Sequence, residues 1–416
     1  MAKPLLSIIS SSHSETLIII LSLFLGSFVQ SKTLDSDTQV LRLIKKSIDP
    51  TSIPSYSYIG SWDFSVDPCE SSGGQFLGIL CSYPSDNSSS RVTAIDLDPI
   101  GYDGFLAPAI GNLTELTILN LHNNKFRGPI PPTISNLKKL TIISLSQNFF
   151  TGSIPDEISQ LKQLQSIDLS ENNLSGFIPA NISGLRSLTY LSLSRNSLSG
   201  RIPDLSGLWR LNILDISINQ FYGIIPKLPA KLRTLSASQN AISGHITPIS
   251  SLQLLRNLDL SNNRLSGPIR QEVLTLPQII RINISVNHFT IFEPIRNPGR
   301  ETHLQLLDAH TNQLHGHLPA SLTMIENLTS INLSHNQFSG PIPMEYGEKL
   351  GSPWKTLFLD NNFLTGNLPQ RFSDGTIKPV RGSLANNCLS CAPTIPLCSG
   401  GQRPASECVS RNDGSQ

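Results

Sequence analysis

The sequence predicts an elongated repeat solenoid of the α/β class, in which about twelve short coils stack and form one long parallel sheet on a concave face. Two observations lead to this prediction. The motif LxxLxLxxNxLxGxIP recurs between residues 92 and 383, at an interval of about 24 residues. Two groups of cysteines flank the repeats, as expected for disulfide-bonded caps that cover the two ends of a solenoid.

Each column of the motif has a physical role. The leucines three and five residues before the asparagine have strand spacing, so both point into the core. The asparagine amide can donate and accept, and can therefore pair backbone groups that the turn after the strand leaves buried. The glycine marks a tight bend, and the Ile-Pro step stiffens the return path. The asparagine column contains Asn124, Asn148, Asn172, Asn196, Asn219, Asn240, Asn263, Asn287, Asn312, Asn336 and Asn362, and a weaker first copy has Ile100 there.

One coil departs from this pattern. Between Asn287 and Asn312, Ile291 replaces the glycine and Glu293 replaces the core isoleucine, and a turn signal follows at residues 297–299. We expect sequence drift in a coil that still closes. A specialised loop, or a hinge that changes the curvature, is the alternative.

Residues 1–31 have the layout of a secretory signal peptide. Lys3 precedes an apolar run from Leu17 to Val29, which is short for a membrane-spanning helix. An uncleaved signal anchor is the alternative that this length disfavours. We therefore expect a secreted mature chain that begins near Lys32, without an integral membrane segment, in the extracellular space, the cell wall or at the outer face of the plasma membrane.

The six cysteines are predicted to form disulfides, because an even number in a secreted chain favours pairing. Cys69 and Cys81 precede the repeats, and Cys388, Cys391, Cys398 and Cys408 follow them. The Cys388–Cys391 spacing is also that of half a metal site or of a redox pair, which an oxidising compartment disfavours. The last four cysteines allow three pairings. Residues 409–416 are polar and expected to be a disordered tail.

Composition and motifs exclude several functions. Lys and Arg number 31 against 30 for Asp and Glu, so the net charge gives no reason to expect nucleic acid, an anionic membrane or a polyanionic ligand. The sequence has no nucleophile elbow, phosphate loop, dinucleotide fingerprint or metalloprotease helix. We therefore predict a protein that is not an enzyme and needs no cofactor or metal.

The Gly-x-Ile-Pro extension of the repeat resembles the plant type of leucine-rich repeat, which occurs in receptor kinase ectodomains and receptor-like proteins. Residues 36–48 have an apolar stripe and a capping box of Ser36 and Gln39, and are expected to be helical. The stretch WDFSVDPCESSGGQFLGILC is similar to that family's N-terminal cap. The resemblance implies a right-handed curved superhelix, a Cys69–Cys81 disulfide, and caps at residues 32–91 and 384–408 around repeats at 92–383.

The resemblance also implies a function in binding. The first hypothesis is a receptor-like protein that recognises a peptide or protein partner and works with a membrane-bound receptor kinase in plant signalling or defence. The alternative is an inhibitor of a pathogen's cell-wall-degrading enzyme, like polygalacturonase-inhibiting proteins, which typically have fewer repeats. Peptide receptors of the family often carry an Arg-x-Arg pair on one strand, and this chain lacks it. Capture of a free peptide C-terminus by that pair is therefore not expected.

The candidate partner site is the concave face of coils two to six. By the repeat register, residues four and six positions before the ladder asparagine point out of the sheet. Exposed isoleucines and a tyrosine beside aspartates are typical of an interface, although isoleucine also simply suits a strand. Tyr190 and Arg195 are the expected anchors. The predicted site residues are Ile118, Asn120, Ile142, Asp168, Tyr190, Arg195, Ile213 and Asp215.

Seven sequons make glycosylation an expectation for the secreted chain. Two of them, at Asn283 and Asn332, fall on predicted concave positions of the C-terminal half, where a glycan would block a ligand. The sequons begin at Asn87, Asn112, Asn173, Asn181, Asn283, Asn327 and Asn332.

Overall fold

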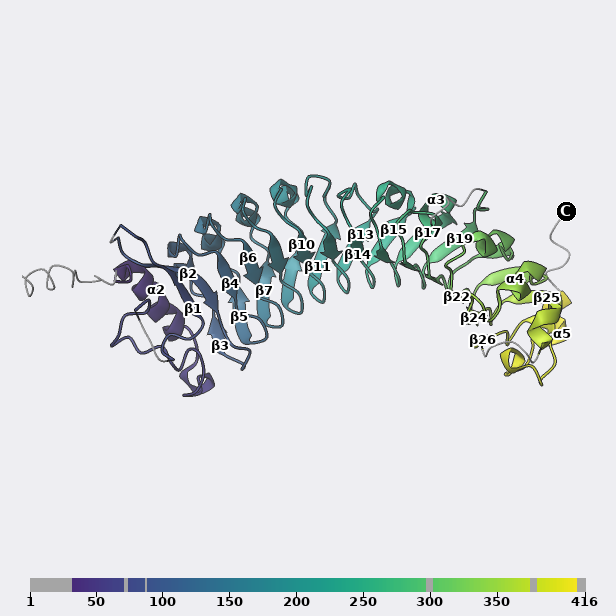
Figure 1. Cartoon of the computed structure of the whole chain (residues 1–416), viewed down its shortest axis with the longest axis horizontal. Helices are drawn as coiled ribbons and strands as arrows, with labels where there is room; N and C mark the ends of the chain where they lie inside the picture. Colours follow the sequence, from purple (N-terminus) through teal and green to yellow (C-terminus); the bar gives the residue numbers. More distant parts are fainter. Residues whose placement is uncertain (1–31, 71–73, 87, 297–301, 375–379, 410–416) are drawn as a thin grey trace, which may run out of the picture.

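The computed structural model describes residues 32–70, 74–86, 88–296, 302–374 and 380–409 (Figure 1). The predicted signal peptide, the sequon at Asn87, the turn at residues 297–299 and the tail after residue 409 lie outside them. The described chain is a curved solenoid with helix α2 (Asp35–Lys46) at one end and α5 (Ala405–Val409) at the other. The repeat architecture predicted from the motif is confirmed.

One sheet of 14 strands runs the length of the solenoid, in chain order. Strand β1 is antiparallel to β2, and the later strands are parallel, each paired in constant register with the coils before and after it. The strands are β1 (Ile79–Ser82), β2 (Arg91–Asp96), β4 (Ile118–Asn120), β6 (Ile142–Ser144), β8 (Ser166–Asp168), β10 (Tyr190–Ser192), β12 (Ile213–Asp215), β14 (Thr234–Ser236), β16 (Asn257–Asp259), β18 (Arg281–Asn283), β20 (Leu306–Asp308), β22 (Ser330–Asn332), β24 (Thr356–Phe358) and β26 (Arg381–Ser383).

A second layer of strands follows the asparagine column and forms a 9-stranded and a 4-stranded sheet. The first contains β3 (Asp103–Phe105), β5 (Lys125–Pro129), β7 (Phe149–Ser153), β9 (Asn173–Gly176), β11 (Ser197–Arg201), β13 (Gln220–Gly223), β15 (Ala241–Gly244), β17 (Arg264–Ile269) and β19 (His288–Phe292). The second contains β21 (His315–His317), β23 (Gln337–Gly340), β25 (Phe363–Asn367) and β27 (Cys388–Ser390).

The gap between these two sheets coincides with the irregular coil. Gly267 adopts a φ of 83° in the glycine column, whereas Ile291 in the next coil does not adopt a positive φ. The register of β17 against β19 shifts at this point. The main sheet crosses the coil without interruption, through β18, β20 and β22. The coil therefore keeps its place in the main sheet, as expected, and among its described strands the interruption lies in the second layer.

The return segments are mostly short 3₁₀ turns. A period of about 24 residues leaves room for only one or two turns of helix in each coil, and proline often occupies their first or second position. The turns are η1 (Pro50–Ser52), η2 (Pro108–Asn112), η3 (Pro132–Asn136), η4 (Asp156–Gln160), η5 (Ala180–Gly184), η6 (Thr247–Ser251), η7 (Ala320–Met324), η8 (Gln370–Ser373) and η9 (Pro396–Cys398), with α-helices α3 (Gln271–Leu274) and α4 (Met344–Lys349) in two coils.

The leucine columns fill one continuous apolar core from Val40 to Leu397. Between this core and the second layer, one asparagine per coil joins neighbouring coils. Asn172 donates from Nδ2 to the carbonyl of Leu145 in the preceding coil (2.9 Å) and to two carbonyls of its own coil, and its Oδ1 accepts from the N–H of Phe150 (2.9 Å). Unpaired, these buried backbone groups would each cost about 1–3 kcal/mol.

The N-terminal cap corrects one expectation. Helix α2 begins at Asp35, and its N-cap residue Leu34 makes no side-chain cap bond, so the capping box of Ser36 and Gln39 is wrong. The entry of the helix is fixed instead by the N–H of Leu34, which donates to the carbonyl of Ser90 (2.9 Å). The buried Asp37 carboxylate accepts from Arg91 Nε (2.9 Å) and from the N–H of Val92 (3.0 Å). The Cys69–Cys81 disulfide is confirmed.

At the C-terminal end, the disulfides are Cys388–Cys408 and Cys391–Cys398. The ladder continues one coil further than predicted, because Asn387 makes the same bonds as Asn362. Gln402 then takes the place of the next asparagine: its Oε1 accepts from the N–H of Leu389 (3.2 Å) and its Nε2 donates to the carbonyl of Leu384 (3.1 Å). The cap therefore ends the ladder by imitating one more coil.

Replacing Gln402 with alanine should fray the last coil. The N–H of Leu389 would lose its partner, at a local cost of roughly 1–3 kcal/mol, while the carbonyl of Leu384 would keep only the bond from Asn387 Nδ2. Hydrogen exchange should show faster exchange at the Leu389 amide, while Gln370→Ala, at an exposed position, leaves it unchanged. Equal exchange in the two variants would contradict this role.

Removing the N-terminal disulfide in a Cys69→Ser/Cys81→Ser variant should loosen α2 and the first coil rather than the whole solenoid. Repeat stability is a sum of coil and neighbour terms, so a loss of roughly 2–3 kcal/mol at one end spreads only partly. We expect hydrogen exchange to increase at α2 and fade along the coils. A uniform increase along all coils would show that the solenoid unfolds as one unit.

Candidate functional site: an open concave sheet face

Tyr190 lies at the centre of the candidate surface. The register of β8, β10 and β12 places Tyr190 between Ser166 and Ile213. In the next outward row, Ser192 lies between Asp168 and Asp215. Burial of the ring raises the pKa of Tyr190, and the charges of Asp168 and Asp215 raise it further, against a hydrogen bond with Ser192 that lowers it. Ser192 is itself only 3% exposed, so the tyrosine side chain is folded down on its own strand.

The aspartates of this surface also build the turn after each strand. Asp168 Oδ1 accepts from the N–H of Ser170 (3.1 Å) and from its hydroxyl (2.6 Å). Asp215 makes the same pair of bonds with Ser217 (3.0 and 2.6 Å). One oxygen of each carboxylate is therefore engaged in a local turn of the kind that Asp side chains favour, and a ligand would meet the second oxygen.

The predicted isoleucines lie on the outward side of the sheet, alternating with buried core residues. Ile142 is 37% and Ile213 is 38% exposed, while Ile118 is half-buried. Asn120 is held in place, since its Nδ2 donates to Asp96 Oδ1 (2.7 Å) and its Oδ1 accepts from the N–H of His122 (3.1 Å). The strands thus present a row of apolar side chains beside a row of polar ones.

Arg195 does not belong to the strand face. It lies on the turn directly before Asn196, with a φ of 54°, in a column where every coil adopts this left-handed conformation. Its N–H donates to the carbonyl of Ser217 in the next coil (3.0 Å). The side chain is exposed and lies at the rim of the surface, five residues beyond Tyr190. The sequence spacing alone could not show that Arg195 lies at the rim of the surface and not on a strand.

Two of the described sequon asparagines lie on the concave strands, as their register predicts. Asn283 ends β18 and Asn332 ends β22. Each Oδ1 accepts from the hydroxyl of the serine two residues later (2.8 Å in both). Asn173 lies instead on β9 of the second layer, and Asn112, Asn181 and Asn327 are exposed in the return segments. Glycosylation itself stays a prediction at each of these positions.

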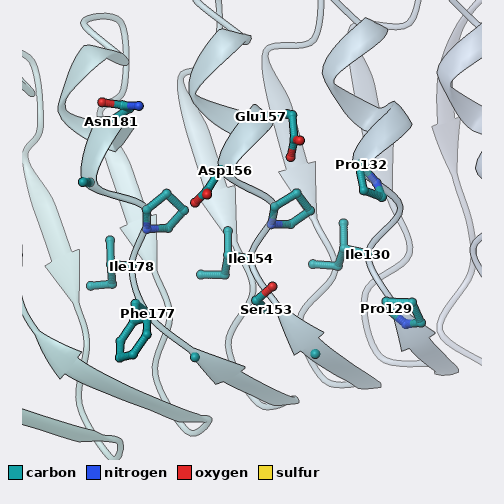
Figure 2. A pocket seen from close by; sticks show the side chains of 15 residues that line it. Pro129, Ile130, Pro132, Ser153, Ile154, Asp156, Glu157, Phe177, Ile178 and Asn181 are labelled. Atoms are coloured by element: carbon teal, nitrogen blue, oxygen red, sulfur yellow. The ribbon is translucent and has the colours of Figure 1, made fainter.

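Sequence reasoning missed a hollow on the opposite side of the coils. It has a volume of about 970 Å³ and lies over the Ile-Pro steps of three successive coils (Figure 2). The buried Ile130, Ile154 and Ile178 form its floor, while exposed Asp156 and Asn181 stand at its rim. The signal was present in the repeated Ile-Pro motif, which we interpreted only as a stiff return path. A glycan at Asn181 would lie beside this hollow.

The concave face and the hollow differ in form. The concave face is an open strand surface, whereas sites that hold small molecules are concave pockets that bury most of the ligand. Within the described residues, no group of three or more His, Cys, Asp or Glu side chains is placed to hold a metal ion. No helix of the described chain is long and apolar enough to span a bilayer.

Family models match several parts of the chain. Leucine rich repeat models match residues 114–174, 138–198, 254–276 and 327–348, and the leucine rich repeat N-terminal domain matches residues 34–82. Receptor-like protein 35 of Arabidopsis thaliana is 34% identical over 111 residues, which are 26% of this chain and 12% of that protein. Receptor-like protein 32 of the same plant is 32% identical over 110 residues, or 26% and 13%. The matched segment thus spans about an eighth of these relatives.

Solved structures match over more of the chain. PEPR1, crystallised with AtPEP1, is 27% identical with a TM-score of 0.70, over 86% of this chain and 52% of that one. The peptide hormone receptor RGFR1, in complex with RGF2, is 32% identical with a TM-score of 0.61, over 72% and 54%. A plant ice-binding protein is 26% identical with a TM-score of 0.57, over 89% and 99%. The chain therefore carries leucine-rich repeats and a leucine-rich-repeat N-terminal domain, and it resembles plant receptor-like proteins and a peptide hormone receptor.

Proposed function

We propose that this protein binds an extracellular peptide or protein on the concave face of coils two to six and acts in plant signalling or defence. The observation that supports this most is the surface around Tyr190, where a half-buried tyrosine lies beside the exposed Ile213 and close enough to Asp168 and Asp215 to feel their charges. Aromatic side chains set in mixed apolar and polar surroundings dominate the energy of protein interfaces.

Two further features favour this proposal. PEPR1 and RGFR1, which share the fold over most of this chain, were crystallised with peptides. All six cysteines are paired, as is usual for proteins of oxidising, extracellular compartments. The same coil geometry occurs in an ice-binding protein, so the fold alone does not determine the ligand, and the proposal depends on the surface.

A membrane-bound receptor kinase is the partner we propose for passing on a signal. The alternative role is inhibition of a pathogen's polygalacturonase by the same concave face. The two roles differ in a direct assay, because an inhibitor lowers the activity of purified polygalacturonase in the absence of any receptor, whereas a receptor-like protein does not.

Partners captured from apoplastic fluid should bind Tyr190→Ala more weakly than the wild type, by about 1–3 kcal/mol in binding free energy. Tyr222→Ala is the matched control, because Tyr222 is a 50% exposed tyrosine on the second layer. Arg195→Glu, a charge change at the rim, should act mainly on the association rate. Calorimetry or biolayer interferometry on the purified pair measures all three.

The contribution of Tyr190 should not change between about pH 5 and pH 8. Its pKa is raised above the ordinary tyrosine value near 10, so the hydroxyl stays protonated and can donate throughout this range.

If Tyr190→Ala binds the partner as tightly as the wild type while Tyr222→Ala loses binding, the partner lies on the second layer instead.

A further inference from the structure

Nine basic residues of coils three to nine form one cationic stripe where each coil approaches its concave strand. All nine side chains are exposed. The six-residue segments that contain them, 137–142, 161–166, 185–190, 208–213, 229–234, 252–257 and 276–281, include no Asp or Glu. The cationic stripe consists of Lys138, Lys139, Lys162, Arg186, Arg210, Lys231, Arg233, Arg256 and Arg281.

The repeat register makes the stripe continuous and oblique. It begins on the turns before the strands, where Lys138, Lys162 and Arg186 occupy the same position of successive coils. It then moves toward the sheet, where the N–H of Arg256 donates to the carbonyl of Arg233 (2.8 Å). It ends on the concave face itself, at Arg281 in β18. Seven coils at about 4.8 Å each give a length of roughly 30 Å.

Most of these cations have no carboxylate partner. Within the described chain, only Lys139 of the nine makes an ion pair, with Glu115 (2.5 Å). Lys138 donates to Gln160 (3.0 Å), and the Arg186 guanidinium lies over the Trp209 ring, 4.6 Å from its centre. Like charges placed this close together repel and do not stabilise the solenoid. Their alignment therefore points to an anionic ligand.

The near-neutral net charge conceals this arrangement. Three aspartates lie at the other ends of the strands in the same coils, at Asp168, Asp215 and Asp259. The concave sheet is thus basic along the edge where its strands begin and acidic along the edge where they end. Overall charge gave no reason to expect a polyanionic ligand, because net charge does not report how the charges are distributed.

We propose that the cationic stripe binds an extended acidic segment, about ten residues long, of the peptide or protein that the concave face recognises. This inference rests on the function proposed above. Five of the nine cations are arginines, whose planar guanidinium groups bind carboxylates with two parallel hydrogen bonds. Trp209, which is 57% exposed in the middle of the stripe, offers an apolar contact between the charges.

A polypeptide fits the stripe better than other polyanions. The cations change position within the coil as the stripe proceeds, and two coils carry two of them. A polysaccharide whose charge is attached directly to every sugar ring calls for a constant offset between coils. The side chains of a peptide can instead reach cations whose position changes from one coil to the next. The stripe is also narrow and ends on a concave face, which a flat bilayer does not enter.

The test uses the full secreted chain and two labelled ten-residue peptides, one of alternating Glu and Gly and one of alternating Gln and Gly. The Arg233→Glu/Arg256→Glu/Arg281→Glu variant reverses the concave end of the stripe. The Lys46→Glu/Lys125→Glu/Arg264→Glu variant has the same net charge, and its three residues are exposed outside the stripe. Circular dichroism melting confirms that both variants are folded.

We expect the Glu peptide to bind the wild type and the control variant equally, and the stripe variant at least tenfold more weakly. Affinity should fall as salt rises, because exposed charges are screened, and the Gln peptide should not bind. Equal binding to both variants, or equal binding of both peptides, would overturn the proposal. Tighter binding of oligogalacturonate or of phosphatidylserine vesicles to the same cations would assign the stripe to a polysaccharide or a membrane and overturn it too.

Binding of the natural partner to the Tyr190→Ala and stripe variants tests this inference separately from the function on which it rests. A partner that loses affinity for Tyr190→Ala but binds the stripe variant normally would refute the acidic-segment proposal and leave the concave site intact. A partner that binds Tyr190→Ala normally but loses affinity for the stripe variant would refute the concave site around Tyr190 and leave the acidic-segment proposal intact. Loss in both variants is the result that both proposals expect.

Discussion

One asparagine side chain in each coil joins that coil to its neighbour, and the rest of the architecture depends on this bond. The chain must turn away from the sheet after only three residues of strand, which leaves buried backbone groups without a partner. Asn172 and its equivalents pair these groups in two coils at once. Where the asparagines end, the cap supplies Gln402 in the same geometry. A solenoid can stop only when its last ladder position is satisfied.

This constraint separates the positions that must stay constant from those that are free to vary. The ladder fixes the strands side by side in constant register, and the leucine columns fill the core beneath them. Outward positions then carry whatever the surface requires, as with Tyr190 and Asp215 on the sheet or Arg256 at its edge. The irregular coil shows the same principle, since Ile291 interrupts the second layer while the ladder bonds of Asn312 are retained.

The repeat, the core columns, the ladder and the Cys69–Cys81 disulfide could be predicted from the sequence, because each depends on local spacing or on a family motif. Features set by contacts between distant segments could not. The start of α2 follows from the bond between Leu34 and Ser90 rather than from Ser36, and Gln402 replaces an asparagine from a segment without the repeat motif. Of the candidate site, the strand residues were placed correctly and Arg195 was not. The cationic stripe could not be predicted from the composition, because acidic residues elsewhere in the chain balance its charges.

The most direct test of the ladder is native-state hydrogen exchange at the amides that donate to asparagine side chains. Those of Phe126, Phe150, Leu174 and Leu265 lie in separate coils, each with one such bond. If the ladder holds the solenoid together, these amides should be among the slowest to exchange and should open together with the neighbouring main-sheet strands. Exchange as fast as that of the exposed return segments, while the main sheet stays protected, would show that the coils are held by the sheet and the leucine core without the asparagines.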